Sequence, residues 1–335
     1  MTELLKSLCM IDGASGDEGA VREFVISQIK GYCEYSVDNL GNIIAFKKGK
    51  NSPAKKVLID AHLDEVGLII THIESNGFLR FKTVGGIDTA ALLFRRVLIN
   101  RRTLGIIGGK PVHLCDGEER KKLPDADSLY IDIGVTSDKD AKELVSVGDC
   151  AVMCSDFTVT GDKVLAKALD DRVGCLVLID LLTQDAEYDF YASFSVQEEI
   201  GLRGAGVAAY TVAPDSAIVI DGTTAADIAG VAESKRVCVQ GEGAVVSFMD
   251  GATSYDRAYY NAALNSGIKA QSKCAVAGGN NAGAIHLSRG GVRTLAISVP
   301  CRYIHTSGSV ADMRDIVAVR DLTKYMINQI AGGKL

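Results

Sequence analysis

Apolar residues along this chain recur at helical spacing in some segments and in short continuous runs in others. Residues 16–30 place Val21, Val25 and Ile29 on one face of a predicted helix, with Glu18 expected in its first turn. Further helices are predicted at 173–183, 205–213, 256–266 and 314–330, and strands at 42–47, 57–61, 190–197, 216–221 and 294–299. Helices and strands thus alternate on both sides of a middle segment, which is typical of an α/β protein.

The middle segment, from Gly67 to about Thr158, has a different pattern. Short β-branched runs follow one another there, separated by glycine and charged clusters, and they predict an antiparallel β unit with little helix. The part before this segment offers too few elements to close a core, so we expect the two flanking parts to fold together. The sequence therefore predicts an α/β domain, a mixed sheet flanked by helices, built from residues 1–66 and 159–335. A mostly-β domain is inserted at 67–158.

Composition narrows the class of protein. The chain has 335 residues, of which 47% are hydrophobic and 23% charged, and this balance predicts a globular protein with a large core. Lysine and arginine number 36 against 42 acidic residues, a net charge of −6, and no basic block is present, so nucleic acid is not expected as a partner. The first residues do not resemble a signal peptide, no apolar stretch reaches 18 residues, and the nine cysteines are scattered, which together predict a cytoplasmic protein without a membrane partner.

Histidines and acids follow several of the predicted strands. In the segment VLIDAHLDEVG, His62 and Asp64 are two residues apart and project from the same side if the strand continues. Such a histidine can bind a metal while the acid orients its imidazole. The alternative interpretation is a histidine at the end of a strand that faces solvent.

Two pairs of adjacent acids form the next candidates. Asp170 and Asp171 precede an apolar helix, where either could be a helix N-cap with Arg172 as its ion partner. Glu198 and Glu199 follow an apolar strand, and two carboxylates left unpaired there would repel each other unless a cation lies between them. One glutamate can then bind metal while the other acts as a general base.

The last two candidates are Asp221 and His305. Asp221 ends the apolar run SAIVID and could instead form a turn before Gly222, and His305 follows the strand TLAISVP. In open α/β sheets, residues after the carboxyl ends of strands surround the ligand site. Histidine and carboxylate ligands without cysteine favour Zn²⁺, Co²⁺ or Mn²⁺, and the number of candidates is sufficient for two ions.

The ordered set of motifs resembles the tetrahedral aminopeptidase family, which includes glutamyl and deblocking aminopeptidases. The resemblance rests on GASGDE near the start, AHLDEVG, LYIDIG and VGD in the middle segment, ALDDRVG, QEEIGLRGA and RYIH. It implies a zinc-exopeptidase fold of the phosphorylase/hydrolase type. It further implies a metal-dependent aminopeptidase that removes N-terminal residues from short peptides.

The resemblance also implies a ligand set for two divalent ions in each subunit, Zn²⁺ or Co²⁺ with Mn²⁺ as a further option. Asp170 would bridge the ions, His62 and Asp221 would share one, and Glu199 and His305 would share the other. The residues by themselves leave the pairing of ligands open. The family further implies that the inserted domain makes a dimer contact and that six dimers form a tetrahedral dodecamer.

Two residues receive catalytic roles from the same resemblance. Glu198 would be the general base that takes a proton from metal-activated water and passes it to the leaving amine, and Asp64 would orient His62. A cis peptide bond is expected between Asp170 and Asp171.

Two segments depart from the family pattern. After RYIH, the pattern Ser-Pro-x-Glu is replaced by Thr-Ser-Gly-Ser at 306–309, and a GGTDAGAI-like segment reads GGNNAGAI, with Asn280 and Asn281. Asn281 and Arg302 are predicted to contact substrate. Because two acidic groups are lost near the substrate, the preferred N-terminal residue is left open.

Two other functions compete with the peptidase. A glycoside hydrolase needs two carboxylates about 5 to 9.5 Å apart on opposite sides of a sugar bond, and the adjacent Glu198 and Glu199 do not flank a bond in that way. The second alternative is a metal-binding assembly protein that has lost its substrate. Loss of activity with EDTA and its recovery with Co²⁺ or Zn²⁺ would favour the peptidase over the first alternative, and hydrolysis of an aminoacyl-p-nitroanilide by metal-loaded protein would exclude the second.

Overall fold

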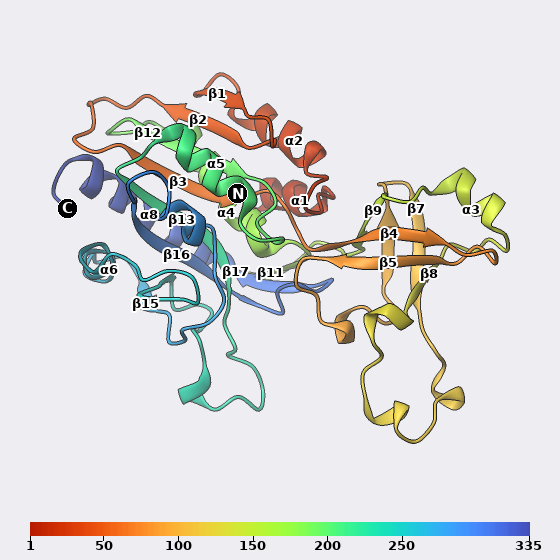
Figure 1. Ribbon diagram of the computed structural model, residues 1–335. Coiled ribbons are helices and arrows are strands. Elements are labelled where there is room, and N and C mark those ends of the chain that lie inside the picture. Colours follow the sequence, from red (N-terminus) through yellow and green to blue (C-terminus); the bar gives the residue numbers. More distant parts are fainter.

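A large mixed sheet and a small closed barrel form the two parts of the computed structural model, which describes residues 1–335 (Figure 1). The main path of the sheet has the strand order β1-β2-β12-β3-β13-β16-β17-β11-β10, and β14 and β15 extend it from β16. These strands are β1 (Glu34–Val37), β2 (Ile43–Lys47), β3 (Val57–His62), β10 (Thr158–Thr160), β11 (Lys163–Ala166), β12 (Phe190–Ser195), β13 (Ser216–Thr224), β14 (Ala244–Val246), β15 (Ala270–Ser272), β16 (Arg293–Arg302) and β17 (Ser309–Asp312). The central strands β12, β3, β13 and β16 are parallel, so their carboxyl ends lie at one edge.

Helices cover both faces of this sheet. One face packs against α1 (Thr2–Met10), α2 (Gly19–Ile29), α4 (Leu169–Thr183), α6 (Arg257–Leu264) and α8 (Met313–Ala331), and the other against α5 (Arg203–Val212) and α7 (Ala282–Ile285). Alternate residues of the central strands supply the two cores: Ile59 of β3 packs in the first and Leu58 in the second. The sheet is therefore the middle layer of three and positions the residues at its strand ends rigidly.

The barrel is built from the middle of the chain. Its strands are β4 (Gly67–Ile73), β5 (Leu79–Val84), β6 (Arg96–Ile99), β7 (Thr103–Gly108), β8 (Tyr130–Asp132) and β9 (Cys150–Met153), and α3 (Asp138–Leu144) precedes β9. Short 3-10 helices are η1 (Thr89–Ala91), η2 (Val112–Leu114), η3 (Glu119–Lys121) and η4 (Ala126–Ser128), with η5 (Glu233–Lys235) outside the barrel. A separate core of 16 buried residues fills it. In Figure 1 the barrel projects from the side of the main sheet.

The predicted fold class, a mixed α/β sheet with an inserted β unit, is confirmed. Two details differ from the prediction. Glu18 is the N-cap of α2, which begins at Gly19, and not a first-turn residue; its side chain makes no capping hydrogen bond and instead accepts from Gly16 N–H at 2.8 Å and Gln197 N–H at 3.0 Å. Helix α1 was not predicted, although Leu5 and Leu8 lie on one helical face and are fully buried.

The cysteines and the long helices add two observations. All nine cysteines are unpaired, and Cys9, Cys175, Cys238 and Cys301 are buried, whereas the others are half-buried or exposed. None of the helices combines the length and the apolar character needed to cross a membrane.

Candidate metal centre and cavity

The parallel strands bring the predicted site residues together at one edge of the sheet. His62 is the last residue of β3, Asp221 lies in β13, and Glu199 follows β12. His305 follows β16, and Asp170 lies at the start of α4. Carboxyl ends of parallel strands are the usual place of a ligand site, and here they collect both histidines and the acids around them.

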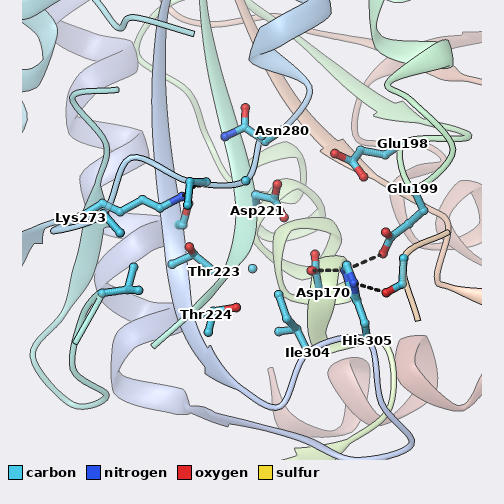
Figure 2. A pocket seen from close by; sticks show the side chains of 18 residues that line it. Asp170, Glu198, Glu199, Asp221, Thr223, Thr224, Lys273, Asn280, Ile304 and His305 are labelled. Carbon is cyan, nitrogen blue, oxygen red and sulfur yellow. Dashed lines mark hydrogen bonds and ion pairs between the residues drawn. The ribbon is translucent and has the colours of Figure 1, made fainter. Parts of the chain in front are cut away.

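Asp170 lies between the two histidines. Its Oδ1 is 3.3 Å from His62 Nε2, and its Oδ2 is 3.5 Å from His305 Nε2. Each imidazole has a second acidic neighbour: Asp221 Oδ1 is 3.8 Å from His62 Nε2, and Glu199 Oε1 is 3.3 Å from His305 Nε2. The contacts of His305 are drawn in Figure 2. The five side chains therefore form two His–acid pairs that share Asp170.

The other ring nitrogens of the histidines are also held. His62 Nδ1 lies 3.0 Å from the carbonyl oxygen of Asp64 and 3.4 Å from its carboxylate. His305 Nδ1 lies 2.8 Å from the carbonyl oxygen of Gly86, which follows barrel strand β5. Contacts of this kind fix the tautomer and ring orientation of metal-binding histidines. Gly86 shows that the barrel side of the chain supports the site.

Asp64 connects this arrangement to the two glutamates. Its carboxylate accepts hydrogen bonds from the backbone N–H groups of Glu198 and Glu199 at 3.0 and 3.1 Å, and from the hydroxyl of Ser15 at 2.6 Å. It is fully buried. One carboxylate thus fixes the segment that carries both glutamates relative to the strand that carries His62.

The charges in the site strongly affect one another. Burial raises the pKa of the Glu198 carboxyl to about 8, with Glu199 and Asp170 adding to this rise and His62 opposing it. Burial alone would lower the pKa of His305, but Asp170 and Glu199 outweigh it and raise that pKa to about 11. Burial by itself would raise the pKa of Asp170. The imidazoles of His305 and His62 outweigh this effect and hold that pKa well below its ordinary value. The site attracts cations.

The residues fit divalent metal ions. Three groups have ligand atoms within 4.8 Å of one another: His62, Asp171 and Asp221; His62, Glu198 and Glu199; and Asp170, Glu199 and His305. Asp170 Oδ1 is buried and makes no hydrogen bond despite its closeness to His62, so it has a free lone pair facing the site. No thiol contributes, since Cys175 Sγ donates to the carbonyl oxygen of His62 at 3.1 Å. Imidazole and carboxylate donors suit Zn²⁺, Co²⁺ or Mn²⁺.

Several alternatives left open by the sequence can now be judged. His62 is only 2% exposed, so it does not face solvent. Asp221 does not form a turn, because β13 continues to Thr224. The backbone of α4 is not helical at Asp170 and Asp171, and Asp171 caps the part of the helix after this kink, accepting from Gly174 N–H at 3.0 Å; the expected cis bond joins it to Asp170.

Arg172 is not the ion partner of these aspartates. Its guanidinium is fully buried and lies 3.5 Å from Glu65, and it donates to the backbone carbonyls of Leu8 and Ile11. Lys167 completes this group with a 2.6 Å contact to Glu65. These contacts hold α1 against the start of α4, so the buried charges of Arg172, Glu65 and Lys167 are explained by their role in the fold.

Left-handed backbone conformations flank the site. Ala168, Gln197, Tyr303 and His305 have φ values of 53°, 59°, 59° and 59°. Such values are uncommon for residues other than glycine and gather at functional sites, where surrounding contacts hold them. Each of these residues is within two positions of a predicted site residue or is one itself.

A cavity of about 400 Å³ opens beside these residues (Figure 2). It is lined by Gly86, Asp170, Glu198, Glu199, Asp221, Gly222, Thr223, Thr224, Val237, Lys273, Ala275, Ala277, Gly278, Gly279, Asn280, Ser298, Ile304 and His305. Sequence reasoning missed Gly86, Lys273, Thr223 and Thr224. The threonines continue strand β13 beyond Asp221 and could have been inferred from it, whereas Gly86 and Lys273 reach the cavity only through tertiary packing.

The two predicted substrate contacts do not line this cavity. Arg302 forms a bidentate ion pair with Asp227, both contacts being 2.7 Å. Asn281 is 1% exposed and donates to Asp60 at 2.7 Å and to Ser195 at 2.8 Å. Its neighbour Asn280 lines the cavity instead.

The contact between Asn281 and Asp60 leads to a stability prediction. Asp60 is fully buried, and burial raises its pKa to about 6 although Ser193, Asn281 and Ser195 donate to it. The substitution Asn281→Asp removes a donor and places a second carboxyl beside the first. We expect it to lower the free energy of unfolding by about 3 kcal/mol at pH 8, through a lost charge-assisted hydrogen bond and like-charge repulsion.

The pH dependence of this loss has a defined sign. Both carboxyls would have folded-state pKa values above their unfolded values, so the folded variant gains relative stability as they are protonated. Urea unfolding of the variant should therefore show a smaller loss at pH 5 than at pH 8. Asn76→Asp, the same change in an exposed turn, is the control and should cost little. An equal loss for both variants would contradict this account.

Comparisons with known proteins agree with these observations. Residues 41–322 match the family described as M42 glutamyl aminopeptidase. A lysyl aminopeptidase of Pyrococcus furiosus is 31% identical, with 98% of this chain and 97% of the relative covered. The crystal structure of a TET aminopeptidase from a marine sediment Thaumarchaeota archaeon is similar with a TM-score of 0.94 at 32% identity, covering 99% of this chain and 98% of that one. The Pyrococcus horikoshii TET1 peptidase, described as assembling into a tetrahedron or a large octahedral shell, has a TM-score of 0.83 at 34% identity, with 96% and 97% covered.

Proposed function

Because the chain belongs to the M42 glutamyl aminopeptidase family, and is thus a hydrolase of the aminopeptidase class, we propose that it removes N-terminal residues from short peptides with two divalent metal ions. In this proposal His62 and Asp221 would hold one ion, His305 and Glu199 would hold the other, and Asp170 would contribute one oxygen to each. The support for this pairing is the set of contacts that each histidine makes with its own acid and with one oxygen of Asp170. Zn²⁺ or Co²⁺ is the expected metal, and Mn²⁺ has the same ligand preferences.

We assign the general base to Glu198. Bound divalent ions lower the pKa of a water molecule and polarise the scissile carbonyl. Glu198 lines the cavity beside Glu199, and one of its carboxylate oxygens lies within 4.8 Å of ligand atoms of His62 and Glu199, so it is placed next to the proposed ions (Figure 2). It accepts the proton of the attacking water and donates it to the leaving amine. Asp64 is a positioning residue, since it holds both His62 and the backbone of Glu198.

The observation that carries this proposal is Asp170, whose two oxygens face two different histidines. The test is hydrolysis of a panel of aminoacyl-p-nitroanilides. We expect EDTA to abolish hydrolysis and added Co²⁺ or Zn²⁺ to restore it. Activity that persists after the metal has been removed would contradict a metal-dependent site.

The same panel tests the competing functions. A glycoside hydrolase would cleave a p-nitrophenyl glycoside and leave the anilides intact. A metal-binding assembly protein would bind the ions and cleave neither substrate. The family membership favours neither of these outcomes.

We further propose that residues 67–158 form a dimerisation domain on a catalytic domain of residues 1–66 and 159–335, and that dimers assemble into a tetrahedral dodecamer. The barrel exposes large apolar side chains, with Leu104 and Ile106 on β7 and Val112, Leu114 and Leu123 on the loop that follows. Exposed apolar groups gathered on one part of a molecule are typical of a contact between subunits. The mass of the particle in solution tests this assembly, and a monomer would contradict it.

A further inference from the structure

The two ends of the cavity differ in chemistry (Figure 2). Glu198, Glu199, Asp170 and His305 line one end. The side chain of Lys273 enters from the opposite end and is the only lysine or arginine among the lining residues. A peptide bound with its amino end at the proposed metal centre therefore extends toward a cation.

The position of Lys273 is fixed by its backbone. It follows β15, and its N–H donates to the carbonyl oxygen of Val246 at 2.9 Å. Its Nζ donates to the carbonyl oxygen of Ala277 at 3.1 Å and has no acidic partner within 4.0 Å. An ammonium has three donors, so at least one remains free for a ligand.

The surroundings of Lys273 leave room for an anionic group. Ala275, Ala277 and Gly278 contribute little side-chain volume to the wall. The hydroxyls of Thr223 and Ser298 line the same cavity and can donate further hydrogen bonds. An ammonium that has no acidic partner and shares a cavity with two hydroxyl groups is suited to a carboxylate.

We propose that Lys273 is a specificity-determining residue that binds a carboxylate of the peptide substrate. This inference rests on the proposed aminopeptidase function. The carboxylate can come from an acidic side chain of the peptide's first residue or from the C-terminus of a very short peptide. Both give the same charge-assisted contact with Nζ, and a basic first residue is repelled.

The experiment has one arm for each source, with kcat and KM measured on the metal-loaded enzyme. Glutamyl- and glutaminyl-p-nitroanilide differ only in the side-chain charge and carry no terminal carboxylate. Trialanine and trialanine amide differ only at the C-terminus. We expect the carboxylate member of one pair to have a kcat/KM about tenfold or more above its neutral partner, mainly through KM.

Lys273→Met should remove this preference, and Lys273→Arg should retain most of it. Lys269→Met is the matched control, because Lys269 is exposed, pairs with Glu242 and does not line the cavity. Equal melting temperatures for the three variants will separate the loss of a substrate contact from loosening of the Ala277 segment. A binding readout in the Glu198→Gln background, by titration with glutamyl- and glutaminyl-alanine amide and with trialanine and its amide, should show the same difference without turnover.

The outcomes separate this inference from the proposed function. If no peptide or anilide is hydrolysed, the proposed function is wrong. If hydrolysis occurs but neither pair shows a preference, or if Lys273→Met keeps the preference of the wild type, the role of Lys273 is wrong while the aminopeptidase stands.

Discussion

Replacing Glu198 with glutamine is expected to lower kcat by about 10²- to 10⁴-fold, the usual contribution of a general base. The amide is nearly the same size as the carboxylate but cannot accept a proton. Asp64 should still hold the backbone of residue 198, because its contact is with the N–H group. The metal content should therefore remain that of the wild type, as measured by elemental analysis of the same samples that are assayed.

The neighbouring Glu199 supplies the matched control. Glu199→Gln removes a group that lies 3.3 Å from His305 Nε2, so this variant is expected to lose metal as well as activity. The pair of variants separates proton transfer from metal binding at adjacent positions. Near-normal turnover by Glu198→Gln would show that another group is the base.

The second large effect is expected from Asp170→Asn. This carboxylate faces both histidines, so its neutralisation should weaken the binding of both ions, with kcat/KM falling by more than about 10³-fold. Loss of metal should be the primary defect. Elemental analysis after dialysis, together with activity at increasing Co²⁺ concentrations, measures it.

Asp171→Asn controls for a change of charge one residue away. Asp171 caps the part of α4 that follows the kink and accepts from the N–H of His62 at 3.2 Å, and its carboxylate also has an oxygen within 4.8 Å of ligand atoms of His62 and Asp221. We expect this variant to lose stability and to keep both ions when folded. Metal loss in Asp171→Asn combined with retention in Asp170→Asn would reassign the bridge.

The strand-end residues were the most predictable part of the molecule. His62, Glu199 and Asp221 each follow or end an apolar run, and the parallel sheet brings such ends to one edge. The alternation of helices and strands also predicted the α/β fold with its β insertion. Local pattern is sufficient here because strands buried on both faces, such as β3 and β13, appear in the sequence as continuous apolar runs.

Other features depend on contacts that no local pattern shows. Gly86 meets His305 across 219 positions of the chain, and Lys273 enters the cavity because β15 joins the edge of the sheet through β14. Asn281 was expected at the substrate but turns instead to buried Asp60. The sequence alone does not show whether the side chain of a polar loop residue will contact the buried core or line the cavity.

The most direct test of a two-metal aminopeptidase is the number of divalent ions at which activity returns. Metal-free protein is titrated with Co²⁺ or Zn²⁺ while bound metal and aminoacyl-p-nitroanilide hydrolysis are measured on the same samples. The arrangement around Asp170 predicts no hydrolysis without metal and full hydrolysis at two bound ions per chain. Full activity in protein that holds no stoichiometric metal would contradict it.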